Sequence, residues 1–162
     1  MNSQVELTED RLDPPARLAS FAAMLEDEGA VASFTGRARG KAKDGSLVGA
    51  LVLETYRGVT LASMQAIVDE AHEKFAISRS HVVHRAGRIL PGEPIVFVAT
   101  ASSHRRAAFE AVNYLMDRLK TEAVFWKREE YTGGVYWIEP TVQDQEDTAR
   151  WLQSEGKENA RN

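Results

Sequence analysis

The stretch PIVFVATASSHRRAAFEAVNYLMDRLK, residues 94–120, joins two patterns and decides the fold that we expect. Residues 94–101 are mostly apolar and predict a β-strand. After Ser102 and Ser103, either of which can cap a helix, apolar residues recur every three or four positions and predict an amphipathic helix. The buried stripe of that helix is expected to contain Phe109, Val112, Leu115, Met116 and Leu119.

The rest of the chain alternates strands and helices irregularly. One further helix is expected from Pro14 to a stop near Gly29, and another is expected after a cap at Thr60. The second of these should bury Leu61, Met64, Ile67, Val68, Ala71 and Phe75. The remaining strands are expected at residues 30–36, 47–56, 80–87, 123–131 and 135–139. Several strands follow one another through short turns, so we predict an α+β fold with a mixed or antiparallel sheet and about three main helices.

The chain is expected to form a single domain over residues 1–140, followed by a polar tail over residues 141–162. A short helix is expected in this tail near Trp151. The tail is either ordered in the chain itself or becomes ordered when a partner binds.

Composition excludes several classes of protein. The chain has 162 residues, a formal net charge of −4 and no cysteine, which excludes disulfides, thiolate metal sites and cysteine nucleophiles. The charge argues against a nucleic-acid partner, and no apolar run approaches the roughly 20 residues that a membrane span needs. The N-terminus lacks the pattern of a signal peptide, so we expect a cytoplasmic protein. The histidine spacing predicts no metal site, and the glycine-rich phosphate-binding motifs are absent.

Cations crowd the start of the expected third helix, where the backbone dipole repels positive charge. His104 and Arg105 would be favourable there if an anion occupied the helix start, whose free N–H groups attract anions. The alternative is that these side chains are solvated and pair with carboxylates elsewhere. Arg106 is assigned to the solvated alternative, because successive helical residues point about 100° apart.

Two lysines lie seven residues apart across the turn from this helix to the next strand. In a strand, Phe125, Lys127 and Glu129 share one face, so Lys127 lies beside large aromatic residues. Burial there would lower its pKa and make it a useful acid, base or nucleophile; alternatively, its side chain extends past the aromatics to water. Lys120 suits the end of a helix on electrostatic grounds alone, but both lysines can point into one pocket.

Arg37 and Arg39 are expected to share a strand face at the mouth of the basic loop 37–46. This loop either closes on an anionic substrate or keeps the surface soluble.

Five motifs resemble the large subunit of molybdopterin synthase, and the resemblance extends over residues 15–151. They are FTGRAR (34–39), PGE (91–93), HRRAAF (104–109), DRLK (117–120) and FWKRE (125–129). The resemblance implies an α/β-hammerhead fold and an enzyme that converts cyclic pyranopterin monophosphate (precursor Z) into molybdopterin. Two sulfurs would come from a thiocarboxylate at the C-terminal Gly-Gly of a small ubiquitin-like subunit. It also implies a homodimer at the core of a heterotetramer, with no cofactor.

Residue by residue, the resemblance implies roles for eleven positions. It makes Lys120 and Lys127 the catalytic pair. The implied substrate contacts are Arg37, Ala38, Arg39, His104, Arg105, Lys120, Lys127, Arg128 and Glu129, and the implied pocket-lining residues are Phe34 and Met116. One departure is Val124, where the family usually has proline.

The length of the third helix adds a geometric expectation. If residues 104–120 form one helix, its ends lie about 24 Å apart, so His104 and Lys120 of one chain cannot both touch one small substrate. We therefore expect a pocket built from two chains, the alternative being separate anion sites. A different function class stays open, a non-catalytic anion-binding scaffold that docks the tail of a ubiquitin-like partner. A phosphoester hydrolase is disfavoured, because no metal cluster or nucleophile motif supports it.

Overall fold

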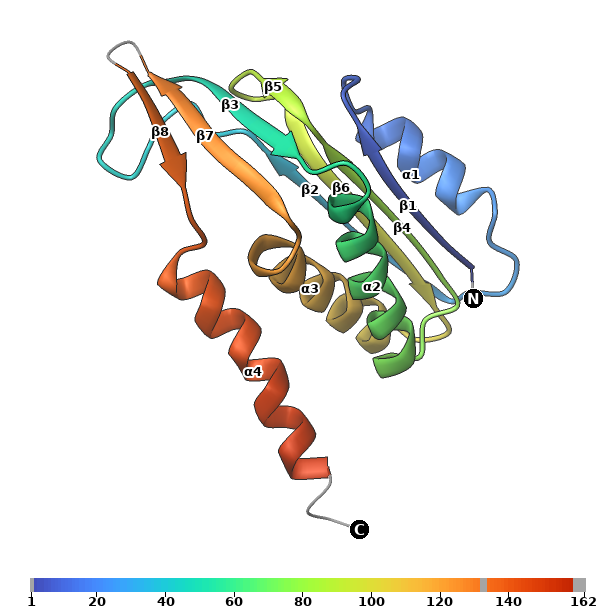
Figure 1. Ribbon diagram of the computed structural model, residues 1–162. Helices are drawn as coiled ribbons and strands as arrows, with labels where there is room; N and C mark the ends of the chain where they lie inside the picture. The colour runs from blue at the N-terminus through green and yellow to red at the C-terminus, as the bar shows by residue number, and fades with distance from the viewer. Residues whose placement is uncertain (1, 132–133, 159–162) are drawn as a thin grey trace.

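The computed structural model describes residues 2–131 and 134–158, which form eight strands and four helices (Figure 1). The first half of the chain contains β1 (Asn2–Thr8), α1 (Pro14–Ala22), β2 (Ala30–Arg37), β3 (Val48–Thr55), α2 (Val59–Lys74) and β4 (Arg79–Arg85). The second half contains β5 (Gly87–Ile89), β6 (Pro94–Ser102), α3 (Arg105–Thr121), β7 (Phe125–Tyr131), β8 (Gly134–Ile138) and α4 (Val142–Glu158). The predicted α+β fold is confirmed.

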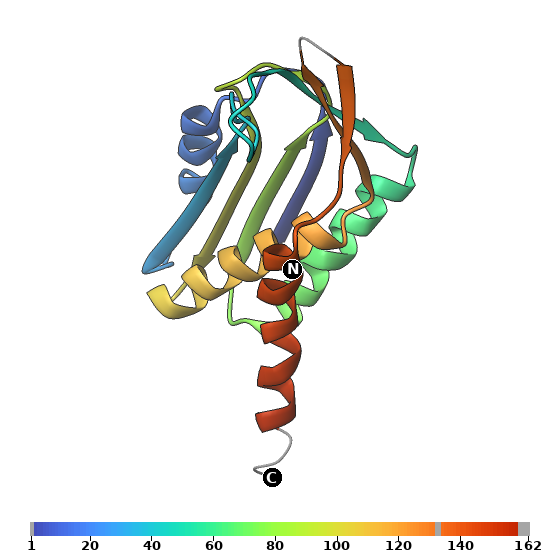
Figure 2. The ribbon, with the colours of Figure 1, turned by 90° about the vertical axis from the view of Figure 1, so that its left-hand side faces the viewer.

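The first sheet has the strand order β1-β4-β6-β2, with β1 parallel to β4 and the other pairs antiparallel. Helices α2 and α3 cover one face of this sheet, and α1 lies on the other (Figure 2). Strand β6 is therefore buried on both sides, which explains why its sequence is a nearly continuous apolar run instead of an alternating one. Its Val98 packs toward α2 and α3, whereas Phe97 and Ala99 pack toward α1.

The second sheet has the strand order β5-β3-β7-β8, and all its pairs are antiparallel. Leu53 of β3 and Ile89 of β5 form a small buried cluster with Ala38. Phe125 packs against both this cluster and the main core, so it ties the start of β7 to the first sheet. The second sheet thereby places β7 beside the end of α3, which is what positions the candidate site.

The serine cap predicted for α3 is wrong. The helix takes His104 as its N-cap residue, with no side-chain cap hydrogen bond, instead of Ser102 or Ser103. The Ser102 hydroxyl donates to the carbonyl oxygen of Ala76, 2.7 Å away, and its oxygen accepts from the backbone N–H of His104, 3.3 Å away, so it bonds to the N-cap residue itself.

The threonine cap predicted for α2 is also wrong, because Gly58 is the N-cap residue and Thr60 lies inside the helix. The buried Thr60 hydroxyl accepts from the backbone N–H of Tyr56 and donates to the carbonyl oxygen of Val124. It therefore joins the start of α2 to the residue that precedes β7.

In each of the helices α2 and α3, one residue that was predicted to lie in the buried apolar stripe is exposed. Phe109 on α3 is 63% exposed and Leu61 on α2 is 41% exposed, whereas Met64 and Leu115 are fully buried. The first helix is also shorter than expected, since α1 ends at Ala22.

The C-terminal helix α4 is longer than the short helix expected near Trp151, and it packs against α3. The Trp151 ring contacts the rings of Phe75 and Tyr114 edge-on, with centroids 5.8 and 5.5 Å apart. This contact fixes α4 to the surface that α2 and α3 form together.

We predict that Leu115→Ala lowers the free energy of unfolding by about 2–5 kcal/mol, because it opens a cavity in the main core. Leu61→Ala is the matched control on a neighbouring helix and should cost less than about 1 kcal/mol. Urea unfolding of the two variants measures the difference, and equal losses would contradict the core described above.

Candidate active site

Strand β7 places Lys127 on the inner side of the second sheet. Alternation along the strand puts Phe125, Lys127 and Glu129 on one face and Trp126 with Arg128 on the other, as predicted. Phe125 is in the core, whereas Trp126 is 49% exposed. The amine of Lys127 therefore lies on the side of the sheet that faces the core.

The surroundings of Lys127 shift its acid–base behaviour. Burial of the amine lowers its pKa, the nearby Lys120 ammonium lowers it further, and the Asp144 carboxylate raises it in part. Burial is the largest of these effects, which agrees with the desolvated interpretation of this lysine. A lysine with a lowered pKa can exchange protons more readily near neutral pH than a solvated one.

His84, on β4, lies on the buried side of Lys127. Burial lowers its pKa to about 4, and the positive charge of Lys127 acts in the same direction. Its Nδ1 lies 2.9 Å from the carbonyl oxygen of Arg85, and its ring stacks on Phe125 with centroids 4.3 Å apart. At neutral pH the lysine therefore faces an uncharged imidazole.

Lys120, in the last turn of α3, comes close enough to Lys127 to perturb its pKa. Its Nζ donates to Oδ1 of Asp144 on α4 at 2.9 Å, and its side chain is 52% exposed. The structure thus brings together the two lysines that the sequence singled out. It adds Asp144, which the sequence analysis missed although the pattern TVQD at 141–144 is typical of a helix-capping motif.

The PGE turn holds the end of β2. Nε of Arg37 donates to the carbonyl oxygen of Gly92 at 2.8 Å, and Ala38 exchanges two backbone hydrogen bonds with Gly92 and Glu93. Gly92 has a φ of +85°, and a Cβ there would lie 3.4 Å from the Arg37 guanidinium, so the turn requires glycine. Strand β2 ends at Arg37, and Arg39 lies beyond it in the loop; the expectation that both share a strand face is wrong.

His104 and Arg105 lie at the opposite end of α3 from Lys120. Both side chains are exposed at the helix start. Because residues 105–121 form one uninterrupted helix, about 24 Å separates the two groups along its axis. A single chain therefore does not bring all the predicted site residues together.

The remaining predicted site residues are dispersed. Arg128 lies on the other face of β7 from Lys127 and pairs with Glu54 at 3.7 Å. Glu129 accepts a hydrogen bond from the Tyr131 hydroxyl, and burial together with the charge of Asp44 raises its pKa. Phe34 on β2 is 42% exposed, and Met116 packs against the main core from α3.

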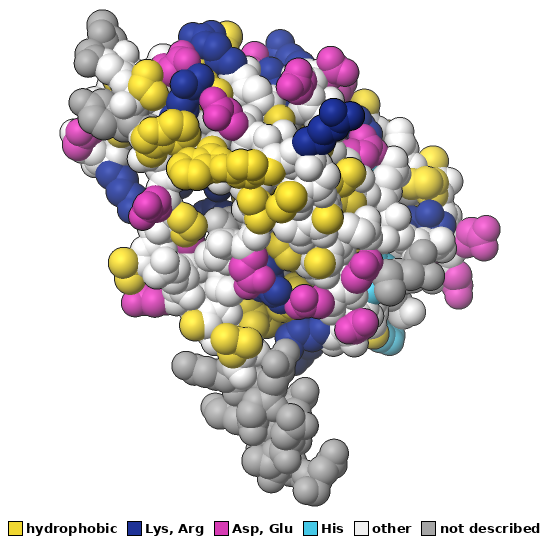
Figure 3. All heavy atoms as spheres, viewed as in Figure 1, with side chains coloured by type: hydrophobic (Ala, Val, Ile, Leu, Met, Phe, Trp, Pro, Cys, Tyr) yellow, Lys and Arg dark blue, Asp and Glu magenta, His cyan; other side chains and the backbone are white. Residues whose placement is uncertain are grey.

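A strip of exposed aromatic side chains runs over the outer face of the second sheet. The rings of Tyr56 and Trp126 lie 6.3 Å apart and those of Trp126 and Trp137 lie 5.3 Å apart. Figure 3 shows hydrophobic side chains gathered over β7 and β8. Exposed apolar patches of this kind are typical of surfaces that bind another protein.

A separate surface hollow of about 280 Å³ lies where β1 and β4 begin, away from the lysines. It is lined by Asn2, Ser3, Gln4, Met24, Arg79 and Ser80. Within residues 2–131 and 134–158, no three His, Asp or Glu side chains are grouped so that they could hold a metal ion. No helix in this part of the chain is both long and apolar enough to cross a membrane.

Comparison with known proteins identifies similar chains. The family profile described as MoaE protein matches residues 7–122. The molybdopterin synthase catalytic subunit of Caulobacter vibrioides is 50% identical over 149 residues, which cover 92% of this chain and 97% of that protein.

Solved structures give the same picture of the fold. The molybdopterin biosynthesis MoaE protein from Burkholderia ambifaria superposes with a TM-score of 0.77 and is 39% identical, covering 92% of this chain and 97% of that one. A chain in the protein–protein complex of subunits 1 and 2 of molybdopterin-converting factor from Helicobacter pylori superposes with a TM-score of 0.67. That match covers 84% of this chain and 89% of that one at 17% identity, so it supports the fold alone.

We predict that His84 makes stability depend on pH. An unfolded histidine takes up a proton near pH 6.5, whereas folded His84 does so only near pH 4, so the unfolded state gains protons first as the pH falls. The free energy of unfolding should therefore drop by about 2 kcal/mol more in the wild type than in His84→Gln between pH 7 and pH 5. Urea unfolding at both pH values measures this difference, and parallel losses in the two proteins would contradict it.

Proposed function

The chain belongs to the MoaE protein family, and on that premise we propose that it converts cyclic pyranopterin monophosphate into molybdopterin. It is an enzyme of molybdenum cofactor biosynthesis. The sulfurs of the product would come from a thiocarboxylate at the C-terminal Gly-Gly of a small ubiquitin-like subunit. The observation that carries the proposal is the half-buried Lys127 beside Lys120, because sulfur transfer to an anionic substrate needs charge neutralisation and proton transfer at one place.

The two lysines supply the chemistry in this proposal. As the thiocarboxylate sulfur forms a C–S bond to the substrate, a C–O bond breaks, and Lys120 and Lys127 neutralise the developing negative charge and give the departing oxygen its proton. Water then cleaves the acyl–sulfur bond, which leaves the sulfur on the substrate and a carboxylate on the small subunit. Burial makes Lys127 the better proton donor, because its lowered pKa weakens its hold on the proton. The half-exposed Lys120 keeps access to the entering substrate.

Substrate binding is assigned to the cations outside this pair. Arg39 lies on the loop beyond β2, and His104 and Arg105 lie at the start of α3, where free backbone N–H groups also favour an anion. These groups would hold the phosphate and the pterin oxygens. Arg37 and Ala38 support the loop through the PGE turn, and the remaining predicted contacts, Arg128 and Glu129, would bind at the margin of the site.

The assembly follows from the length of α3. We propose a homodimer in which His104 and Arg105 of one chain reach the Lys120 and Lys127 of the other, so that each site is completed across the interface. A small subunit bound to each large one would give a heterotetramer. The exposed aromatic strip on β7 and β8 supports binding of a protein partner. The proposal includes a cytoplasmic location, which cell fractionation tests.

Replacing Lys127 by alanine should reduce turnover at least about 100-fold, because the half-buried proton donor is lost. Binding of the small subunit, measured by calorimetry, should persist, since the bulk of its contact surface is unchanged. Lys74→Ala, at the end of α2, is a matched control that should keep full turnover. Near-normal turnover of Lys127→Ala would refute the catalytic role and favour a non-catalytic scaffold.

Mixed dimers test the shared site. A chain carrying Arg105→Ala and a chain carrying Lys120→Ala should each be inactive as homodimers. Their heterodimer contains one site with both residues intact, so it should regain about half of the activity of the wild type. Inactivity of a well-folded heterodimer would show that both residues act within one chain.

A further inference from the structure

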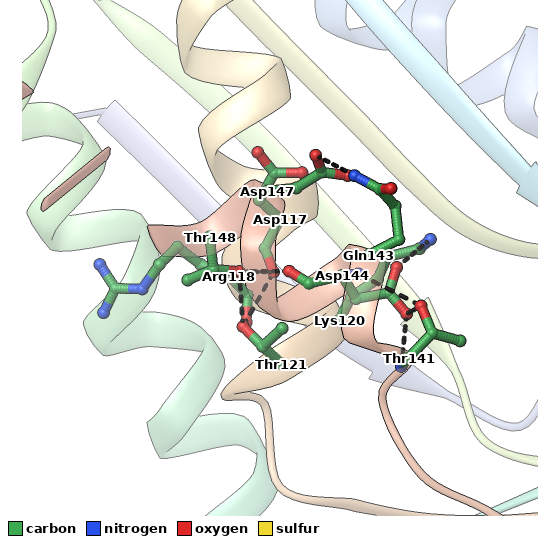
Figure 4. Close-up of polar contacts among 9 residues, drawn as sticks. All are labelled: Asp117, Arg118, Lys120, Thr121, Thr141, Gln143, Asp144, Asp147 and Thr148. Atoms are coloured by element: carbon green, nitrogen blue, oxygen red, sulfur yellow. Dashed lines mark hydrogen bonds and ion pairs between the residues drawn. The ribbon is translucent and has the colours of Figure 1, made fainter. Parts of the chain in front are cut away.

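The start of α4 carries a carboxylate that is held unusually firmly. Asp144 is the third residue of this helix, and its Oδ2 accepts from the backbone N–H and the hydroxyl of Thr141, at 2.9 and 2.8 Å (Figure 4). In return, the Thr141 hydroxyl oxygen accepts from the backbone N–H of Asp144 at 3.2 Å. This reciprocal arrangement is a capping box, which fixes both the helix start and the direction of the carboxylate.

The other oxygen of the same carboxylate faces the end of α3. Oδ1 of Asp144 accepts from Nζ of Lys120 at 2.9 Å, and the Asp144 side chain is only 18% exposed. An exposed ion pair between two flexible side chains contributes little to the free energy of folding. The Asp144 carboxylate is already held in place by Thr141, so the ion pair fixes the position of the Lys120 amine.

A second group of contacts, one to two turns further along α4, docks the helix on α3. The Thr148 hydroxyl donates to the carbonyl oxygen of Asp117, and the Asp117 carboxylate accepts from Arg150 and Trp151 at 2.8 Å each. The position of Asp144 therefore follows from the packing of residues 144–151 of this helix on α3 and not from a local loop.

Three ionisable groups from three elements face Lys127. They are His84 on β4, Lys120 on α3 and Asp144 on α4. His84 is uncharged above about pH 4, so Asp144 supplies the negative charge that balances the two lysines. Burial by itself raises the pKa of Asp144, but the hydrogen bonds from Lys120 and Thr141 and the charge of Lys120 outweigh it and lower the pKa to about 2, which keeps the carboxylate ionised at working pH.

We propose that Asp144 is a positioning residue of the reaction, which holds the Lys120 ammonium next to Lys127 and provides their shared counter-charge. This inference rests on the proposed function for the roles of the two lysines. It makes α4 a part of the active site, since the helix delivers a charge that no other element supplies to this pair among the described residues.

Asp144→Asn tests the inference, because asparagine keeps the size of the side chain and an oxygen for the cap but removes the charge. Asp147→Asn, one turn further on, removes an equal charge from a carboxylate that contacts Gln143 instead of a lysine. The first readout is the titration of Lys127 in the isolated full chain, followed by NMR with 13C-labelled lysine. The midpoint should move about half a pH unit or more to lower pH in Asp144→Asn and stay unchanged in Asp147→Asn.

The second readout is turnover by the complete enzyme. The basic limb of the kcat/KM profile should move to lower pH in Asp144→Asn, with a loss of about tenfold at neutral pH and partial rescue in Asp144→Glu. An unchanged Lys127 titration overturns the proposal whatever the activity, and so does a shifted titration with a wild-type pH profile. Absence of turnover in the wild-type protein would count against the proposed function. The titration of Lys127 tests the electrostatic coupling to Asp144 independently of turnover.

Discussion

The length of α3 constrains the site more than any other feature. This helix lies on the first sheet through one buried side, so it is held rigid, and it carries cations at both ends. A helix rises 1.5 Å per residue, so the His104 end and the Lys120 end are about 24 Å apart and no loop motion can bring them together. A site that uses both ends must therefore involve two copies of the chain.

Around one end of this helix, the fold assembles charges that lie far apart in the sequence. Strand β7 is held by the second sheet and presents Lys127 toward the core, while α3 ends with Lys120 beside it. Helix α4 packs against α3 and adds Asp144. Partial burial weakens the hold of Lys127 on its proton, and the Asp144 carboxylate limits how far that effect goes. The balance of the three charges is what suits this end of the molecule to proton transfer and anion binding.

Much of this arrangement could be predicted from the sequence. Strands β6 and β7 could be predicted, because β6 is a nearly continuous apolar run and because alternation in β7 places Lys127 on the same face as Phe125. The starts of α2 and α3 could not be predicted, because their N-cap residues, Gly58 and His104, make no side-chain cap hydrogen bond of the kind that a sequence motif indicates. Hydrophobic periodicity also misassigns residues at the edge of an apolar stripe, since Phe109 was predicted to be buried but is exposed. The role of Asp144 was not predicted, because a capping motif indicates where a helix begins but not which neighbouring helix the second carboxylate oxygen will contact.

In the proposed dimer two chains share each site, and one distance between the two chains tests this directly. The natural chain has no cysteine, so Ser103→Cys in one protomer and Glu122→Cys in the other would each carry a single spin label in a co-expressed mixed dimer. Within one chain these positions are about 28 Å apart along α3. We expect the measured separation between protomers to be shorter than that. A separation as long as the within-chain distance, or longer, would contradict the shared site.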